Sequence, residues 1–242
     1  MNLGTMRRRF VGKSLSTKDY VQNGLIAMWD GIENIGIGKH SDNASEWVDL
    51  TGNGRNWQLI NSAHFDANSL VASNTTSITY SNTIPPDQHV TQEIVFKVIS
   101  DSKDNTNSRT VILKFGNYYE SGQYKLSLNG FSFNRTSGRP HGWMPKTANA
   151  VDMNTLVIPK TPICSTVIYA QPNTTNTPPQ VVKINGQLKT VGTSDGLGGS
   201  ASNACGLENG HIYAIRIYNR ALTADEISKN FALDKKRFGL NI

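Results

Sequence analysis

Short runs in which apolar and polar residues alternate recur along most of the chain. From about residue 77 onward these runs are rich in β-branched and aromatic residues and are bounded by Gly, Asn, Ser or Pro. In TQEIVFKVIS, for example, Ile94, Phe96 and Val98 fall on one face. A period of two over a few residues is typical of strands that are buried on one side. The pattern therefore predicts an all-β protein built from many short strands.

The run PQVVKINGQLKTVG predicts a tight hairpin. Val182 and Ile184 alternate with polar residues as far as Asn185-Gly186, and Leu188 resumes the apolar pattern. Asn and Gly tolerate the positive φ that both central residues of a type I′ turn require. We therefore expect two antiparallel strands joined at this Asn-Gly pair.

The end of the chain predicts a strand followed by a short helix. The strand spans His211 to Tyr218, where apolar residues alternate. Thr223 is a suitable N-cap, and Glu226 three residues later completes a capping box. Leu222 before the cap and Ile227 in the first turn can form a hydrophobic staple. These signals predict a helix that begins directly after Thr223.

The composition agrees with a β protein rich in loops. Charged residues make up 17% of the chain, and Asn, Thr, Ser and Gly are abundant. No apolar run reaches the roughly 18 residues that a membrane span needs, so we expect no membrane insertion. The basic leader continues as FVGKSLSTKDY, without the apolar segment of a secretory signal, so we expect no cleaved signal peptide.

Positive charge is concentrated at the two ends of the chain. Residues 1–24 hold five basic side chains and one acidic side chain, and residues 229–242 hold four and one. If both ends lie on one side of the fold, they form a cationic patch that suits an anionic partner surface. Arg7, Arg8 and Arg9 would make the contact, with other virion or surface proteins as partners and nucleic acid not expected. The alternative is two solvated tails.

Four segments resemble laminin-G-like, concanavalin-A-like lectin/glucanase domains. IRIYNRALTADEI (Ile215–Ile227) resembles the family's closing strand and small helix, and VVKINGQL resembles its Asn-Gly hairpin. GLIAMWDG and WVDLTGNGRNWQL resemble its first strand and the turn that follows. The resemblance implies a two-sheet antiparallel jelly-roll sandwich with a short C-terminal helix and neighbouring terminal strands. It divides the chain into a basic arm, residues 1–22, and a sandwich, residues 23–242.

The resemblance also implies a function. Such domains bind glycans or proteins and are common in bacteriophage virions and on bacterial surfaces. We therefore expect a binding or assembly module located in a virion, as a capsid decoration, fibre or tail protein. The alternative is a carbohydrate-binding adhesin that is secreted or displayed on a bacterial cell surface.

Catalysis is not expected from the acidic residues. Glycosidases need two carboxylates a short distance apart, and on a strand these would lie two or four positions apart. The Glu-x-Asp-x-x-Glu pattern of bacterial laminarinases is absent, and the predicted strands carry single acids such as Glu93. We therefore expect no enzyme, no catalytic residue and no cofactor; a glycoside hydrolase is the less favoured alternative, and it would need two carboxyl groups facing each other across a groove. Asp101 and Asp104 are interpreted as a solvated turn, and no pattern supports a metal site, including one for structural calcium.

The best candidates for glycan binding are aromatic residues in polar segments, because sugar rings stack on exposed aromatic faces. Trp143 lies in TSGRPHGWMPK, a segment expected to be exposed and rich in turns, with Arg139 and His141 beside it. Tyr118 and Tyr119 lie near an expected hairpin tip. The alternative for Trp143 is that it closes the end of the sandwich.

Other residues that could carry chemistry are better explained by packing. Trp29, Trp47 and Trp57 are flanked by apolar strand residues, so we expect them in the core. Cys164 and Cys205 are too few for a disulfide framework, and burial as small apolar residues is favoured over one bridge or a reactive thiol.

Overall fold

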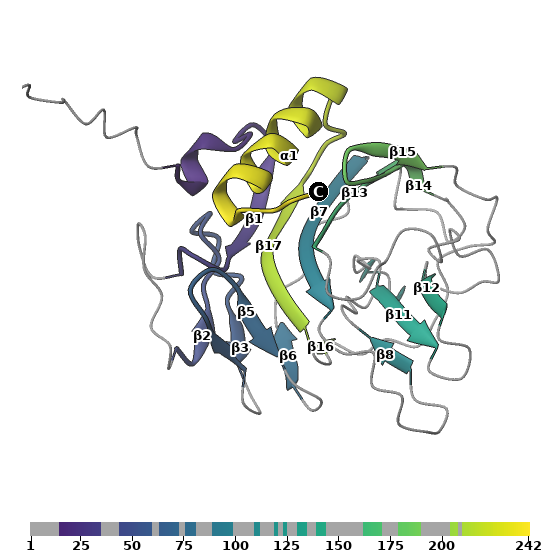
Figure 1. Cartoon of the computed structure of the whole chain (residues 1–242). Helices are drawn as coiled ribbons and strands as arrows, with labels where there is room; N and C mark the ends of the chain where they lie inside the picture. The colour runs from purple at the N-terminus through teal and green to yellow at the C-terminus, as the bar shows by residue number, and fades with distance from the viewer. Residues whose placement is uncertain are drawn as a thin grey trace, which may run out of the picture.

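Antiparallel strands make up most of the regular structure in the part of the chain that the structure describes (Figure 1). This computed structural model also contains one short 3-10 helix, η1 (Thr17–Asp19), and one α-helix, α1 (Ala224–Phe238). The prediction of an all-β protein with a C-terminal helix is therefore confirmed. The described residues are 15–34, 44–59, 63–72, 76–80, 89–98, 109–111, 119–120, 123–124, 130–134, 139–143, 162–170, 179–189, 204–207 and 210–242.

The largest sheet has eight strands in the order β15–β14–β13–β7–β17–β5–β4, and β1 also pairs with β17. All its pairs are antiparallel. Its strands are β1 (Leu25–Asp30), β4 (His64–Phe65), β5 (Leu70–Ala72), β7 (His89–Val98), β13 (Ile163–Ala170), β14 (Pro179–Ile184), β15 (Gln187–Lys189) and β17 (Gly210–Tyr218).

Three smaller antiparallel sheets complete the described strands. The four-stranded sheet, in the order β16–β6–β3–β2, contains β2 (Glu46–Trp47), β3 (Trp57–Leu59), β6 (Thr76–Tyr80) and β16 (Ala204–Leu207). The three-stranded sheet, in the order β12–β11–β8, contains β8 (Arg109–Val111), β11 (Gly130–Asn134) and β12 (Arg139–Trp143). The two-stranded sheet contains β9 (Tyr119–Glu120) and β10 (Gln123–Tyr124).

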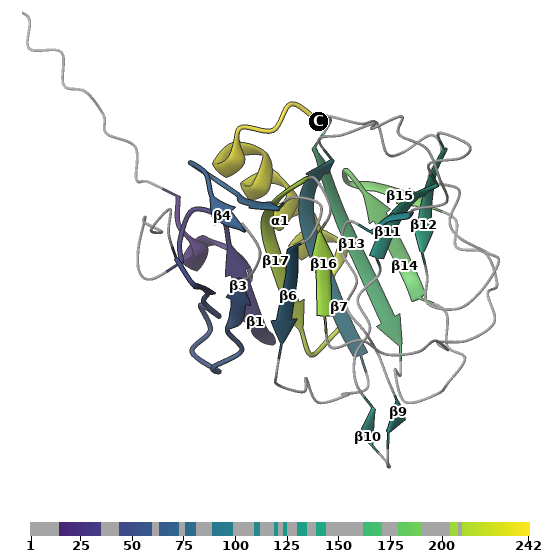
Figure 2. The ribbon, with the colours of Figure 1, turned by 90° about the horizontal axis from the view of Figure 1, so that it is seen from below.

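The large sheet is covered on both faces. Helix α1 lies over one face, and the four-stranded sheet lies over the other (Figures 1 and 2). The two sheets pack through fully buried aromatic rings: Trp29 of β1 meets Trp57 of β3 with ring centroids 5.2 Å apart. The ring centroid of Trp47 of β2 lies 6.2 Å from that of Trp57 and 6.3 Å from that of Phe65 of β4. The prediction that these three tryptophans form the core is confirmed.

Helix α1 begins as its sequence predicts. The Thr223 hydroxyl accepts a hydrogen bond from the Glu226 backbone N–H at 3.3 Å, and the Glu226 carboxylate accepts one from the Thr223 N–H at 2.9 Å. Leu222 and Ile227 are buried in one apolar cluster with Tyr218 of β17. The capping box and the hydrophobic contact across the helix start therefore hold α1 on the sheet.

The hairpin between β14 and β15 also has the predicted geometry. Asn185 has a φ of 49° and Gly186 a φ of 76°, as a type I′ turn requires at both central residues. The Asn185 side-chain oxygen accepts a hydrogen bond from the Cys164 N–H at 2.8 Å, which ties the turn to β13. A Cβ at position 186 would lie 3.0 Å from the Phe231 ring, so glycine also lets α1 approach the hairpin.

The two ends of the described chain meet, as the resemblance implied. Strands β1 and β17 pair antiparallel, with Leu25 opposite Tyr218. Before β1, the Val21 N–H donates to the Asn230 side-chain oxygen of α1 at 3.0 Å. Tyr20 and Val21 are both buried, so the described part of the predicted arm packs against the C-terminal helix. Arg7, Arg8 and Arg9 lie outside the described residues.

Candidate functional site

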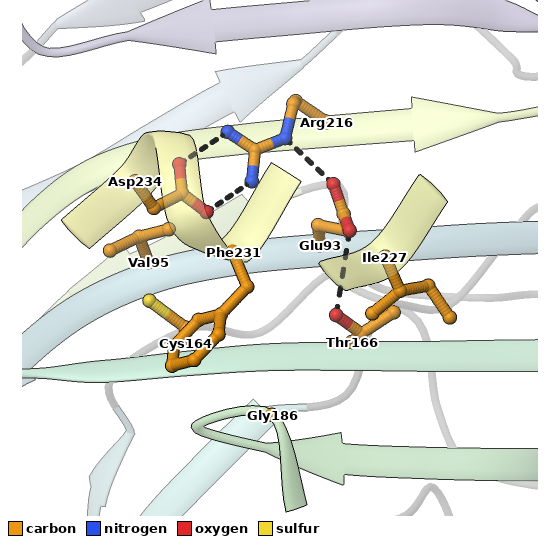
Figure 3. Close-up of a pocket in the computed structure, with 9 residues that line it drawn as sticks. All are labelled: Glu93, Val95, Cys164, Thr166, Gly186, Arg216, Ile227, Phe231 and Asp234. Carbon is orange, nitrogen blue, oxygen red and sulfur yellow. Dashed lines mark hydrogen bonds and ion pairs between the residues drawn. The ribbon is translucent and has the colours of Figure 1, made fainter. Parts of the chain in front are cut away.

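A buried charged cluster joins α1 to the large sheet (Figure 3). Arg216 of β17 is 1% exposed, and its Nε donates to Glu93 of β7 at 2.8 Å. Its two terminal nitrogens donate to the Asp234 carboxylate of α1 at 2.8 and 2.6 Å. The guanidinium therefore holds one carboxylate from the sheet and one from the helix, with charge-assisted hydrogen bonds to both.

Neutral polar groups complete the hydrogen bonding around this cluster. Asn230 of α1 donates to the Glu93 carboxylate at 2.8 Å and to the Tyr218 hydroxyl at 3.0 Å. The Tyr20 hydroxyl donates to Asp234 at 2.8 Å, and the Arg216 guanidinium lies 4.3 Å from the centroid of the Tyr20 ring. Each of the two carboxylates therefore has a neutral partner in addition to Arg216.

Burial governs the protonation of the groups around the cluster. Removal from water raises the pKa of Glu93, and the charge of Arg216 opposes this increase. Burial likewise raises the pKa of Tyr20 and of the Cys164 thiol, so both stay protonated at neutral pH. Cys164 is a free, buried cysteine, as expected for a small apolar residue. The cluster therefore combines a fixed cation with carboxylates that lie out of contact with bulk water.

The cavity beside this cluster is too small for a substrate. It measures about 10 Å³, which is near the lower limit for a single water molecule. Its lining comes from α1, β7, β13, β17 and the Asn-Gly turn: Glu93, Val95, Cys164, Thr166, Gly186, Arg216, Ile227, Phe231 and Asp234 (Figure 3). The arrangement can orient and hold the helix, but a sugar could not reach its carboxylates.

A second charged cluster fastens the last turn of α1 to the start of the chain. The Arg237 guanidinium contacts the buried Asp30 carboxylate of β1 and lies 3.0 Å from a Glu33 oxygen. Glu33 also accepts a hydrogen bond from the Thr17 hydroxyl of η1 at 2.6 Å. Burial raises the pKa of Asp30, and the Arg237 charge opposes this change. The two clusters together join η1, β1, β7, β17 and α1 into one frame.

The predicted glycan-binding residues lie elsewhere, on the edge strand β12 (Arg139–Trp143). This strand pairs antiparallel with β11 over its whole length. The expectation of a turn-rich segment is therefore wrong at these five residues. Pro140 suggested a turn, but β12 ends the order of its sheet, and proline is tolerated on an edge strand. Arg139, His141 and Trp143 occupy alternate positions of β12 and thus share one face.

The other predicted site residues are only partly described. Tyr119 lies in β9, which forms a hairpin with β10 in which Glu120 is opposite Gln123, so the expected hairpin is present. Tyr118 lies outside the described residues, as do Asp101 and Asp104. Cys205 lies in β16, whereas Cys164 lies in β13 of the large sheet.

The described residues contain neither a cluster of metal ligands nor a helix that could cross a membrane. No group of His, Cys, Asp and Glu there could hold a metal ion. Within the same part of the chain, α1 is too short and too polar to cross a membrane.

The sequence matches no known protein family and no curated protein. Solved structures do match the fold. Trypanosoma rangeli sialidase superimposes with a TM-score of 0.57 at 15% identity, over 88% of this chain and 33% of the sialidase. The same sialidase in complex with sialic acid gives 0.54 at 15% identity, with the same coverage.

A toxin domain gives a similar result. The receptor-binding domain of botulinum neurotoxin mosaic serotype C/D superimposes with a TM-score of 0.58 at 14% identity, over 86% of this chain and 50% of that domain. The chain shares a fold with both. It spans about a third of the sialidase and half of the toxin domain, and the identity is low. The likeness therefore establishes a common β-sandwich fold and no activity.

These comparisons correct the expectation that the chain is not an enzyme. Its fold neighbours include sialidases, which are enzymes, so the absence of paired acids on one predicted strand does not exclude catalysis. The spacing of acidic residues along one strand concerns only carboxylates that lie on the same strand. Carboxylates from different strands can also come together, and the spacing does not exclude them. Neither the sialidase nor the toxin domain supports the expected role in a virion.

Proposed function

We propose that the chain is a carbohydrate-recognition module that binds glycans displayed on a surface. The observation that carries this proposal is the likeness of fold, over more than four fifths of the chain, to two kinds of glycan- or receptor-recognising protein. One is a sialidase in complex with sialic acid, and the other is the receptor-binding domain of a toxin. The same proposal includes membership of the laminin-G-like family and the jelly-roll connectivity of its strands.

The chain offers the side chains that sugar recognition uses. Trp143 supplies an aromatic ring, and Arg139 and His141 supply hydrogen-bond donors on the same face of β12. The Arg216 and Arg237 clusters supply a rigid frame, because they fasten both ends of the described chain to the large sheet.

Replacing Trp143 by alanine is expected to weaken glycan binding by about tenfold or more, since stacking on an aromatic ring contributes on the order of 1–2 kcal/mol. Binding should be measured on a broad glycan array and then by calorimetry with the best ligand. Trp143→Phe keeps an aromatic face and should retain part of the affinity. Wild-type protein that binds no glycan on the array would contradict the proposal.

A second candidate role is assembly through the basic ends, in a virion or on a bacterial surface. It is favoured by the packing of Tyr20 and Val21 against α1, which brings the start of the described chain beside a helix with exposed Lys229 and Lys236. The described start of the chain, where Lys18 is exposed, thus lies beside the exposed lysines of α1, and positive charge gathered there would suit an anionic partner.

Deleting residues 1–14 tests the assembly role. The melting temperature should change little because Tyr20 and Val21 remain. Co-sedimentation of the chain with the virion or with the bacterial surface assembly should be lost. The double variant Lys229→Ala/Lys236→Ala should weaken the same association without removing the arm. Full-length protein that always sediments alone would rule out this role.

A further inference from the structure

Residues 16–21, which include η1, form a strap beside α1 (Figure 1). The Val21 N–H donates to the Asn230 side-chain oxygen at 3.0 Å, and the Tyr20 hydroxyl donates to the Asp234 carboxylate at 2.8 Å. Asn230 and Asp234 are four positions apart and therefore lie on one stripe of the helix. The strap thus holds α1 along one side, over successive turns.

Tyr20 of the strap links the two charged clusters that fasten α1. Its ring centroid lies 4.3 Å from the Arg216 guanidinium and 5.8 Å from the Arg237 guanidinium. Tyr20 is 1% exposed, and a cation is attracted more strongly to an aromatic face where water is excluded. This one side chain therefore contacts the cation of each cluster and one carboxylate of the first.

The strap is attached to the fold by these contacts and not by a strand ladder, because it ends before β1 begins at Leu25. A turn lies at each end of it. The Ser16 N–H donates to the Asp19 carboxylate at 2.8 Å, and the Leu25 N–H donates to the Gln22 carbonyl at 3.1 Å. A segment between two such turns can leave α1 without breaking the pairing of β1 with β17.

The layer beneath α1 differs from the core between the sheets. The two packed sheets meet through the rings of Trp29 and Trp57, on the face of the large sheet away from α1 (Figure 2). Beneath α1, the buried charges of Glu93 and Arg216 lie beside the apolar contacts. Charged groups regain hydration when they meet water, which lowers the cost of separating such a layer. We therefore expect the helix layer to open more easily than the aromatic core.

We propose that residues 16–21 are a removable strap that locks α1 onto the large sheet. Displacing the strap lets α1 rise from the sheet while the two packed sheets stay folded. Local openings of this kind occur in elements that are attached less strongly than the core. The strap follows the segment that contains Arg7, Arg8 and Arg9, so a partner bound to those residues would act on the helix through the strap.

Cys164 of β13 is a reporter for this opening. It is free and 7% exposed, and it lies with Phe231 and Asp234 of α1 around the cavity of about 10 Å³ (Figure 3). That cavity is too small for a thiol reagent. The chain has one other cysteine, so Cys205→Ala confines labelling to Cys164. The rate of labelling with dithiobis(nitrobenzoate) then measures how often α1 leaves the sheet.

In this Cys205→Ala background, adding Tyr20→Ala should make Cys164 label about a hundredfold faster, because the ring and the hydroxyl are both lost. Tyr20→Phe keeps the ring and loses only the bond to Asp234, so labelling should be about tenfold faster. Lys18→Ala is the matched control within the strap. Lys18 is exposed, so its removal should leave the rate unchanged.

The sheets are followed in parallel by the fluorescence of the buried tryptophans. It should stay native in Tyr20→Ala, and low urea should change the labelling rate little, because a local opening exposes little surface. Equal labelling of Tyr20→Ala and its Cys205→Ala parent overturns the inference. A labelling rate that rises with urea as steeply as native fluorescence is lost also overturns it, because α1 and the sheets would then unfold as one unit.

Discussion

Replacing Arg216 by alanine is expected to destabilise the protein by about 3–5 kcal/mol, which is a large part of the stability of most domains. The substitution leaves the Glu93 and Asp234 carboxylates buried without their shared cation. It also removes one of the links between the sheet and α1. Urea unfolding followed by circular dichroism measures the loss directly.

Arg220→Ala is the control for this experiment. Arg220 also pairs with a carboxylate of α1, but its side chain and that of Glu226 are each 26% exposed. Its removal should cost less than about 1 kcal/mol, because water and salt screen such a pair. Similar losses for the two variants would show that the Arg216 cluster does not hold the helix.

The loss caused by Arg216→Ala should also depend on pH. Burial raises the pKa of Glu93, and the increase should be greater once the opposing cation is gone. A carboxyl group whose pKa is higher in the folded than in the unfolded state favours folding as the pH falls. The free energy of unfolding lost on Arg216→Ala should therefore be larger at neutral pH than in mild acid.

Replacing Trp29 by alanine is expected to cost about 3–5 kcal/mol through the cavity that it leaves in the core. Trp29 is fully buried and touches Trp57 across the two packed sheets. Its indole N–H also donates to the Arg55 carbonyl at 2.9 Å, which helps to hold the turn after β2. Urea unfolding followed by circular dichroism measures this loss of stability as well.

Leu188→Ala provides the comparison for Trp29→Ala. Leu188 is 69% exposed, so its truncation should change stability by no more than about 0.5 kcal/mol. Both substitutions remove a large apolar side chain from the large sheet, and they differ in burial. If Trp29→Ala costs less than about 1 kcal/mol, the proposed packing between the two sheets is wrong.

Local signals in the sequence were reliable where neighbouring residues decide the structure. Asn185-Gly186 predicts a turn because both residues accept positive φ, and both have it. Thr223 and Glu226 predict the start of α1 because each satisfies an unpaired N–H of the other. The apolar strand residues that flank Trp29 predicted its burial in the core for a similar reason, because they too are close to it in the chain.

Local signals failed where pairing with another strand decided the outcome. Pro140 was taken as part of a turn, whereas β12 accommodates it because that strand lies at the edge of its sheet. Trp143, Arg139 and His141 were still chosen as candidates, because their chemistry is independent of the secondary structure.

The sequence by itself determined the class of fold, the capped terminal helix, the Asn-Gly hairpin and the aromatic core, because each depends on residues close together in the chain. Only the tertiary structure decided the two charged clusters. Glu93 and Arg216 are 123 positions apart, and the arm residue Thr17 reaches Arg237 through Glu33. A charged side chain in an apolar strand is costly to bury by itself. It is stabilised by the oppositely charged and hydrogen-bonding partners that folding brings next to it.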